Sequence, residues 1–136
     1  MNKSGDDAEF KTWLTYIASK IADETFYTKV AGVSHANDDG TSRQELVSMC
    51  EPRQWLNLEA DPGNAFHKKA VRVLTEDGHQ LGFLDRRCAQ EITNKAIAGD
   101  RFAAAVCGKR KAEEAKFWGL VIVIFRLNAA YRLKVV

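Results

Sequence analysis

Short segments of β character, separated mainly by turns or short helices, constrain the fold of this chain most. Two of them flank Glu76-Asp77-Gly78, and an Asp-Gly pair between apolar runs predicts a β-hairpin. Strands joined by hairpins pair antiparallel, whereas a parallel sheet needs long crossovers. Aromatic and β-branched residues predict strands at residues 26–33, 55–59, 70–74, 80–84, 102–106 and 119–127, and a last one at 131–135. The fold class is therefore mainly β (α+β), a small antiparallel barrel of about six strands.

A stripe of apolar residues recurs every three or four positions near the N-terminus: Phe10, Trp13, Leu14, Ile17 and Ile21. This spacing predicts an amphipathic helix over about residues 6–23. We divide the chain into an N-terminal helical extension, residues 1–25, and a β domain, residues 26–136. We expect the stripe to pack on the β domain. The alternative is a helix that docks a partner protein or forms a homodimer with a second copy of the chain.

Two further helices are predicted from their ends. Ser42-Arg43-Gln44-Glu45 matches the Ser-x-x-Glu capping box, so a short helix should run to about Cys50. Asp85 can cap a helix over about residues 86–98, and Gly99 stands where such a helix ends. The barrel is therefore expected to carry two helices besides the N-terminal one.

Composition excludes several classes of protein. The 136 residues are 46% hydrophobic and 28% charged, which is typical of one globular domain and not of a disordered chain. A formal net charge of +2 excludes a polycationic protein. That figure combines three basic and five acidic residues in positions 1–25 with a body of net charge +4. The basic excess therefore lies in the β domain.

Three cysteines without a close pair exclude a disulfide framework and a Cys-x-x-Cys zinc knuckle. The N-terminus has no apolar signal-peptide segment, and the longest apolar run, residues 120–125, is far too short to span a bilayer. We therefore expect a cytoplasmic protein without contact to a membrane.

Motifs of catalysis are missing from the sequence. Gly108-Lys109 lacks the upstream glycine and the Ser/Thr of a P-loop, and neither Gly-x-Ser-x-Gly nor His-Glu-x-x-His occurs. We expect no catalytic residue, no metal and no cofactor. A hydrolase or nuclease that uses His35 or His67 with nearby acids remains a remote alternative.

Polar, aromatic and basic residues gather around the central hairpin and the helix after it: Asn64, Phe66, His67, Lys68, Lys69, Arg72, Arg86 and Arg87. Cations pair with phosphates, aromatic rings stack on bases, and amides read base edges or sugar hydroxyls. The composition alone indicates a face for an anionic ligand, and a solvated surface is the other interpretation of the same residues.

The block from Glu59 to Val73, Glu-Ala-Asp-Pro-Gly-Asn-Ala-Phe-His-Lys-Lys-Ala-Val-Arg-Val, resembles the core motif of the HIRAN domain family. The usual form of that motif is acidic-Pro-x-Asn-Pro-Tyr-Asp-x-Asn-Ala-Val-x-Val. Residues 30–33 resemble the opening strand of the family, residues 39–44 a segment of stand-alone bacterial members, and residues 78–84 the Gly-x-x-aliphatic-Gly-(Tyr/His)-Leu block. The resemblance spans about residues 26–127.

The resemblance implies a modified OB-like barrel and capture of the 3′ end of single-stranded DNA. By position, Asn64 and Phe66 would hold the terminal nucleotides, with Phe66 as the stacking ring in place of tyrosine. His67 stands where the family has an aspartate that accepts a bond from the 3′ hydroxyl. The resemblance also assigns nucleic-acid binding to further residues: Arg86 near phosphate, His35 at an aromatic position, and Phe117 or Trp118 as a second stacking surface. Lys68 and Lys69 are predicted to bind nucleic acid from the basic composition of this face.

Besides His67 in place of aspartate, two further departures from the motif bear on these roles. Ala65 replaces proline, so the turn is less rigid, and Lys69 replaces asparagine. Together these observations predict a non-enzymatic single-stranded DNA-binding module of repair, replication or mobile elements. Because the family domain accompanies helicases and nucleases, a separately encoded helicase or nuclease is the expected partner. The alternative is a protein-interaction adaptor that uses the N-terminal helix and does not bind DNA.

Overall fold

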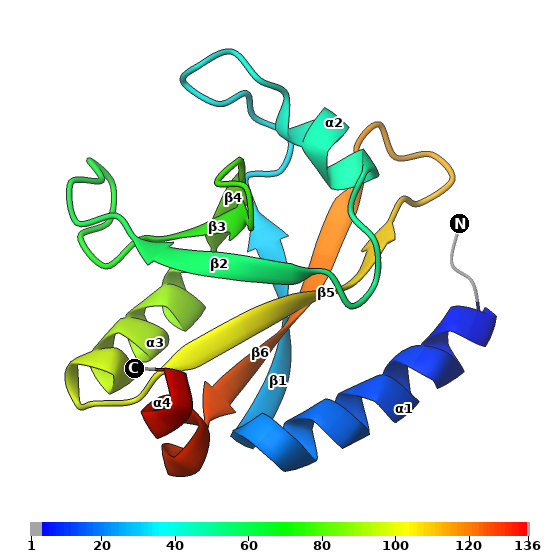
Figure 1. The fold of residues 1–136 in the computed structure, drawn as a ribbon. Coiled ribbons are helices and arrows are strands. Elements are labelled where there is room, and N and C mark those ends of the chain that lie inside the picture. Colours follow the sequence, from blue (N-terminus) through cyan, green and yellow to red (C-terminus); the bar gives the residue numbers. More distant parts are fainter. Residues whose placement is uncertain (1–3, 136) are drawn as a thin grey trace.

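The computed structural model describes residues 4–135 and closes six strands into one antiparallel barrel (Figure 1). The strands are β1 (Ala22–Ala31), β2 (Trp55–Ala60), β3 (Val71–Thr75), β4 (Gln80–Leu84), β5 (Phe102–Arg110) and β6 (Gly119–Leu127). The helices are α1 (Ser4–Ile21), α2 (Arg43–Ser48), α3 (Arg86–Ile97) and α4 (Ala129–Val135). Around the barrel the order is β1-β4-β3-β2-β5-β6. The predicted antiparallel barrel is therefore confirmed.

The long apolar run of β6 is buried on both sides of the sheet. Leu120, Ile122 and Ile124 belong to the cluster that fills the barrel. Val123 and Phe125 alternate with them and belong to a second cluster, between the outer face of β5–β6 and α1. Successive side chains of a strand point to opposite faces, so a strand covered on both faces is apolar at every position. The uninterrupted run therefore marks the part of the sheet that a helix covers.

Helix α1 lies against this outer face as the sequence predicts. Phe10 and Ile21 are buried there, and Trp13, Leu14 and Ile17 pack against the same cluster. The apolar stripe that motivated the adaptor and homodimer interpretations is thus covered by the barrel of the same chain. The adaptor interpretation loses the observation on which it depended.

Four aromatic rings form the centre of this contact. The ring centroids of Trp13 and Trp55 are 5.7 Å apart, and those of Trp55 and Phe125 are 5.5 Å apart. Trp13 also meets Phe125 edge-on at 6.4 Å, and Phe10 lies 5.5 Å from Trp13. Tilted and edge-to-face pairs at such distances stabilise beyond the area they bury. We call these four rings the aromatic cluster.

The β3–β4 hairpin turns at the predicted Asp-Gly pair. The Thr75 amide donates to the His79 carbonyl and the Gly78 amide to the Thr75 carbonyl, both at 2.9 Å. Gly78 has φ +91°, a left-handed conformation that glycine adopts without cost. Gly82 in β4 is needed for another reason, since a Cβ there would lie 2.3 Å from the carbonyl oxygen of Ala31. The backbone of β1 can approach β4 this closely only at a glycine.

Both capped helices begin where the sequence predicts. Ser42 Oγ accepts a hydrogen bond from the Glu45 amide at 3.2 Å, and Asp85 Oδ1 accepts one from the Cys88 amide at 2.8 Å. Each cap satisfies an amide that the first helical turn leaves without a partner. Helix α3 starts directly after β4 for this reason, which places Arg86 at the end of the sheet.

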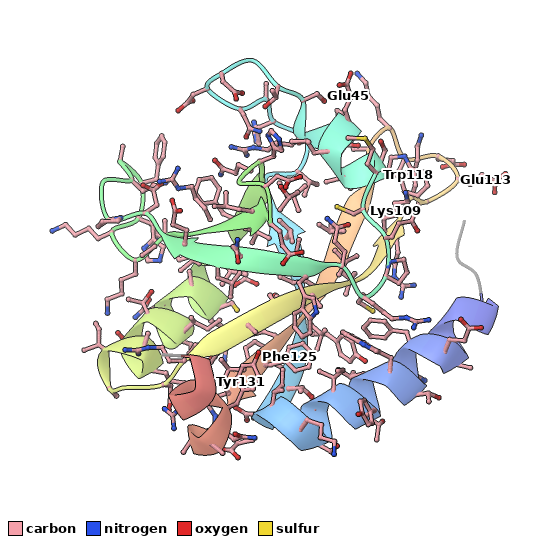
Figure 2. All side chains as sticks on the ribbon, viewed as in Figure 1. Glu45, Lys109, Glu113, Trp118, Phe125 and Tyr131 are labelled. Atoms are coloured by element: carbon pink, nitrogen blue, oxygen red, sulfur yellow. The ribbon has the colours of Figure 1, made fainter. Side chains whose placement is uncertain are left out.

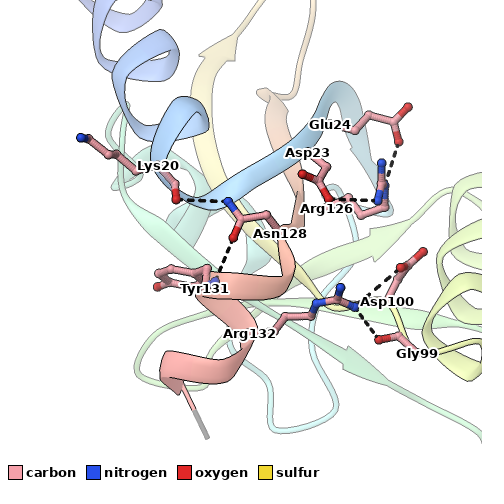
Figure 3. A network of polar contacts seen from close by, with 9 residues as sticks. All are labelled: Lys20, Asp23, Glu24, Gly99, Asp100, Arg126, Asn128, Tyr131 and Arg132. Atoms are coloured by element: carbon pink, nitrogen blue, oxygen red, sulfur yellow. Dashed lines mark hydrogen bonds and ion pairs between the residues drawn. The ribbon is translucent and has the colours of Figure 1, made fainter.

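The predicted last strand, residues 131–135, is wrong, because this segment is helix α4. Asn128 caps it. Its Oδ1 accepts from the Tyr131 amide at 2.8 Å and its carbonyl from the Arg132 amide at 3.1 Å (Figure 3). Its Nδ2 donates to the Lys20 carbonyl at 3.2 Å, and Arg132 donates to the Gly99 carbonyl at 2.9 Å. The cap and these tertiary contacts favour a helix over β propensity.

Some strand boundaries also differ from the prediction. β1 begins at Ala22, four residues before the predicted strand, and β5 continues to Arg110 instead of ending at Val106. Pairing of Arg110 with Gly119 sets the length of β5, with an irregularity between Val106 and Gly108. Across residues 4–135, we find no helix with both the length and the apolar character needed to cross a membrane.

Candidate nucleic-acid interface

The β2–β3 loop, residues 61–70, is folded around the side chain of Asn64. Its Oδ1 accepts hydrogen bonds from the amides of Phe66 at 2.9 Å and His67 at 3.1 Å. Its Nδ2 donates to Asp61 Oδ2 at 3.3 Å, and its amide donates to the Asp61 carbonyl at 3.0 Å. An asparagine that bonds the backbone two and three residues ahead imposes a turn. Asn64 therefore shapes the loop.

This turn presents Phe66 to solvent. The side chain is 87% exposed, the most exposed of the large hydrophobic residues among the described positions. Hydrophobic residues scattered singly over a surface are ordinary, but this ring lies in a loop whose backbone is fixed and whose neighbours are cations. A fixed, exposed ring is a surface on which a base can stack with little loss of conformational entropy.

Three hydrogen bonds attach the loop to α3. Arg86 Nη2 donates to the Phe66 carbonyl at 2.6 Å, and Lys69 Nζ donates to Asn94 Oδ1 at 2.6 Å. Thr93 Oγ1 donates to the Lys69 carbonyl at 3.3 Å. The loop is thus held at both ends of its basic segment, and the β2–β3 loop and α3 lie on one side of the molecule, at the left of Figure 1.

His67 lies partly under the loop. Its Nε2 is shielded from solvent and has no hydrogen-bond partner within the described part of the chain. The edge of the imidazole that carries Nε2 is therefore turned inward. In this conformation a ligand at the loop surface does not meet that nitrogen.

A row of residues crosses the outer surface of the barrel beside this loop. In the register of the sheet, Ala31 faces Phe83, Phe83 faces Arg72 and Arg72 faces Glu59. Directly paired residues point to the same face of a sheet. Arg72 forms ion pairs with Glu59 at 3.1 Å and Asp61 at 3.8 Å. The two carboxylates nearest the loop are therefore neutralised by an arginine of β3.

Phe83 is the residue of this surface that sequence reasoning missed. It lies on β4 between the β2–β3 loop and the connection from β1 to α2, and the guanidinium carbon of Arg43 stands 5.5 Å from its ring centre. The sequence signal that could have identified Phe83 is its position directly after Gly82, within the block of residues 78–84 that resembles the family. The adjacent Leu84 is buried, so alternation points Phe83 outward, and the irregularity in the β3–β4 register at Leu81 lets Leu81 be buried as well.

His35 is exposed in the connection between β1 and α2, and its amide donates to the Gly32 carbonyl at 3.2 Å. Arg43 holds this connection from beneath, with Nη1 donating to the Gly32 carbonyl at 2.9 Å and Nε to Asn37 Oδ1 at 2.7 Å. Burial lowers the pKa of Arg43 below its usual value, but these bonds are those of the charged guanidinium. His35 thus adjoins the Phe83 surface from the opposite side to Phe66.

Trp118 belongs to a separate basic and aromatic platform next to α2 (Figure 2). Gln44 fixes its backbone, donating to the Trp118 carbonyl at 2.9 Å and accepting from its amide at 2.8 Å. The amino groups of Lys109 and Lys111 lie 5.7 and 5.8 Å from the ring centre. Lys109 also donates to the Ser48 carbonyl. Such cation–π contacts keep positive charge and an aromatic surface together.

The structure therefore brings together six of the eight predicted residues: Asn64, Phe66, His67, Lys68, Lys69 and Arg86. His35 lies in the β1–α2 connection and Trp118 lies next to α2, so neither belongs to the β2–β3 loop. Among the side chains that the structure describes, those of residues 8–132, no three or more histidine, cysteine or acidic groups gather in a way that could hold a metal ion.

Comparisons with known proteins agree with this architecture. Residues 23–117 match the model of the HIRAN domain family. The fold is similar to the crystal structure of the HIRAN domain of human HLTF, with a TM-score of 0.58, 18% identity and 85% of each chain covered. A structure of a protein from Lactobacillus plantarum is similar as well, with a TM-score of 0.50, 15% identity, and 76% of this chain and 100% of that chain covered. No curated protein matches the sequence.

Proposed function

The chain belongs to the HIRAN domain family, and we propose that it is a non-enzymatic module that binds single-stranded DNA at a 3′ end. The observation that carries the proposal is the exposed ring of Phe66 in a loop that Asn64 and Arg86 hold in place. This ring stands beside the uncompensated cations of the loop. A stacking surface next to phosphate-binding groups is the arrangement that single strands require.

Each residue has a distinct part in the proposed complex. The terminal base stacks on Phe66, and Lys68 and Arg86 meet the phosphates that follow it. Arg86 donates one of the five N–H groups of its guanidinium to the Phe66 carbonyl at 2.6 Å. The same side chain therefore holds the backbone that carries the ring and offers further donors to phosphate. Asn64 acts through the loop, because its oxygen is engaged by two amides.

The remaining predicted residues extend this surface. We propose that His35 and Phe83 border the path of the strand, and that Trp118 with Lys109 and Lys111 forms a second stacking platform. His67 replaces the family aspartate with a group that is neutral or cationic. Stacking and phosphate contacts therefore hold the bound end, and a bond from the terminal hydroxyl to His67 contributes less. A helicase or nuclease would act on the DNA that this module holds.

Fluorescence anisotropy with three DNA ligands of one sequence tests the proposal: a linear strand with a 3′ hydroxyl, the same strand with a 3′ phosphate, and a circular strand without ends. We expect binding that weakens with salt, and weaker binding of the circle than of the linear 3′-hydroxyl strand. Equal affinity for all three ligands would overturn end recognition. No salt-sensitive binding to any of them would overturn nucleic-acid binding.

A further inference from the structure

A groove of about 490 Å³ runs along the exposed side of α3 and starts at the residue that holds Phe66. Its lining residues are Arg86, Arg87, Gln90, Glu91 and Asn94. Residues four apart on a helix are neighbours, so Arg86, Gln90 and Asn94 follow one another along its length. The groove thus runs between two places where α3 bonds to the β2–β3 loop. At the first, Arg86 donates to the Phe66 carbonyl, and at the second, Lys69 donates to Asn94 at 2.6 Å.

The groove offers donors to an anionic ligand. Arg87 is exposed and makes neither a hydrogen bond nor an ion pair with any residue that the structure describes. Arg86 has one backbone contact, and Lys69 adds a third cation at the far end. Glu91 is the single acidic lining residue and opposes an anion. Cationic and amide donors in a row fit a sugar-phosphate backbone.

We propose that this α3 groove holds the backbone of the nucleotides on the 5′ side of the bound end. The inference rests on the proposed function, because the end must be held at Phe66 for the strand to enter at Arg86. From Arg86 to Asn94 the helix rises about 12 Å, the length of three to four stacked nucleotides at about 3.4 Å each. The length of the groove therefore sets the number of nucleotides that the protein binds. Its contacts are to phosphates and do not depend on the identity of the bases.

The experiment compares oligothymidylates of two and eight nucleotides with 3′ hydroxyl ends, on the wild-type chain and on Arg87→Ala/Gln90→Ala. We expect the double variant to bind the eight-nucleotide strand about tenfold more weakly and the dinucleotide unchanged. Glu91→Gln should act in the opposite direction, strengthening binding of the longer strand by a few fold. Lys20→Ala is the charge-matched control, because it removes a cation from α1, which lies on a different side of the barrel from α3 (Figure 1).

Modified strands identify the groups that the groove contacts. An eight-nucleotide strand with neutral methylphosphonate linkages at the third to fifth positions from the 3′ end should bind the wild-type chain more weakly than the unmodified strand does. The loss of affinity should equal the loss that Arg87→Ala/Gln90→Ala causes with the unmodified strand. The double variant should then show no further loss with that strand. A strand with abasic sites at those positions should bind like the unmodified one.

Two results overturn the inference while the proposed function stands. The first is an equal loss for the dinucleotide and the eight-nucleotide strand, which would place Arg87 in the end site. The second is unchanged binding of both. If the wild-type chain binds neither strand, the proposed function fails, and the α3 groove fails with it.

Discussion

Aromatic residues occupy two opposite environments in this protein. In the aromatic cluster, Phe125 is fully buried and packs against Trp13 and Trp55, beneath α1. On the β2–β3 loop, Phe66 is 87% exposed and lies beside cations. Both are phenylalanines within or next to strands of one barrel, and nothing in their residue type distinguishes them.

The difference is decided by what covers each ring. Phe125 points to the outer face of β6, which would be surface in a bare barrel, and α1 converts that face into a second core. Phe66 is in a loop that its own hydrogen bonds hold away from the barrel. The ring of Phe125 stabilises the folded state, and the ring of Phe66 remains accessible to a ligand. The following experiments test that division, from the largest expected effect to the smallest.

Phe125→Ala should give the largest loss of stability. Removing a fully buried phenylalanine leaves a cavity and costs about 3–5 kcal/mol in the free energy of unfolding. Urea denaturation followed by tryptophan fluorescence measures this, because Trp13 and Trp55 adjoin the site. The matched control is Phe66→Ala, the same change on the loop, which should alter stability by less than about 0.5 kcal/mol. Similar losses in the two variants would break the comparison.

Gly82→Ala should destabilise the barrel although Gly82 adjoins the exposed surface. The added Cβ would lie 2.3 Å from the Ala31 carbonyl oxygen and 2.8 Å from Val30, so β1 and β4 must separate. We expect a loss of about 1–3 kcal/mol, as for overpacking elsewhere. Gly63→Ala is the control, since a Cβ there meets nothing within 4 Å. Equal thermal midpoints of the two variants would show that β1 and β4 tolerate the separation.

Phe66→Ala should affect binding and leave the fold intact. Loss of one stacking ring costs about 1–3 kcal/mol of binding free energy for a single strand. Anisotropy with a 3′-hydroxyl strand measures the loss, and Phe66→Tyr, which restores the residue usual in the family, should recover the affinity. If Phe66→Ala binds like the wild type, the exposed ring is not the stacking surface.

The last experiment follows the pH dependence of stability and tests the barrel interior. Burial raises the pKa of the Cys50 and Cys88 thiols from 9.0 to about 11. Folding thus favours the protonated thiols. Their contribution is fully present below pH 9 and is lost as pH rises through about 11. The urea midpoint should fall over this range.

The control for this effect is Cys50→Ala/Cys88→Ala, which removes both thiols. Its urea midpoint should fall less steeply between pH 9 and pH 11 than that of the wild type, whatever its absolute stability. An unchanged slope would assign the pH dependence to other groups, such as Tyr27, whose pKa burial also raises.

Much of the fold could be predicted because its signals are local. The Asp-Gly pair gave the β3–β4 hairpin, the caps Ser42 and Asp85 gave the starts of α2 and α3, and apolar periodicity gave α1. The motif around Asn64 indicated the loop in which five proposed site residues gather. Helix α4 was missed, because Asn128 caps it while bonding to the end of α1, a contact between residues 108 positions apart.

The sequence by itself determined the antiparallel barrel, its hairpins and the family, since each depends on alternation, turn residues or a contiguous motif. The tertiary structure alone decided which aromatic rings are covered, that Phe83 joins the exposed row, that His67 Nε2 is turned inward, and that α3 provides a groove beside the loop. The physical reason is that burial and exposure depend on elements distant in sequence. No local pattern records which face of a strand a helix will cover.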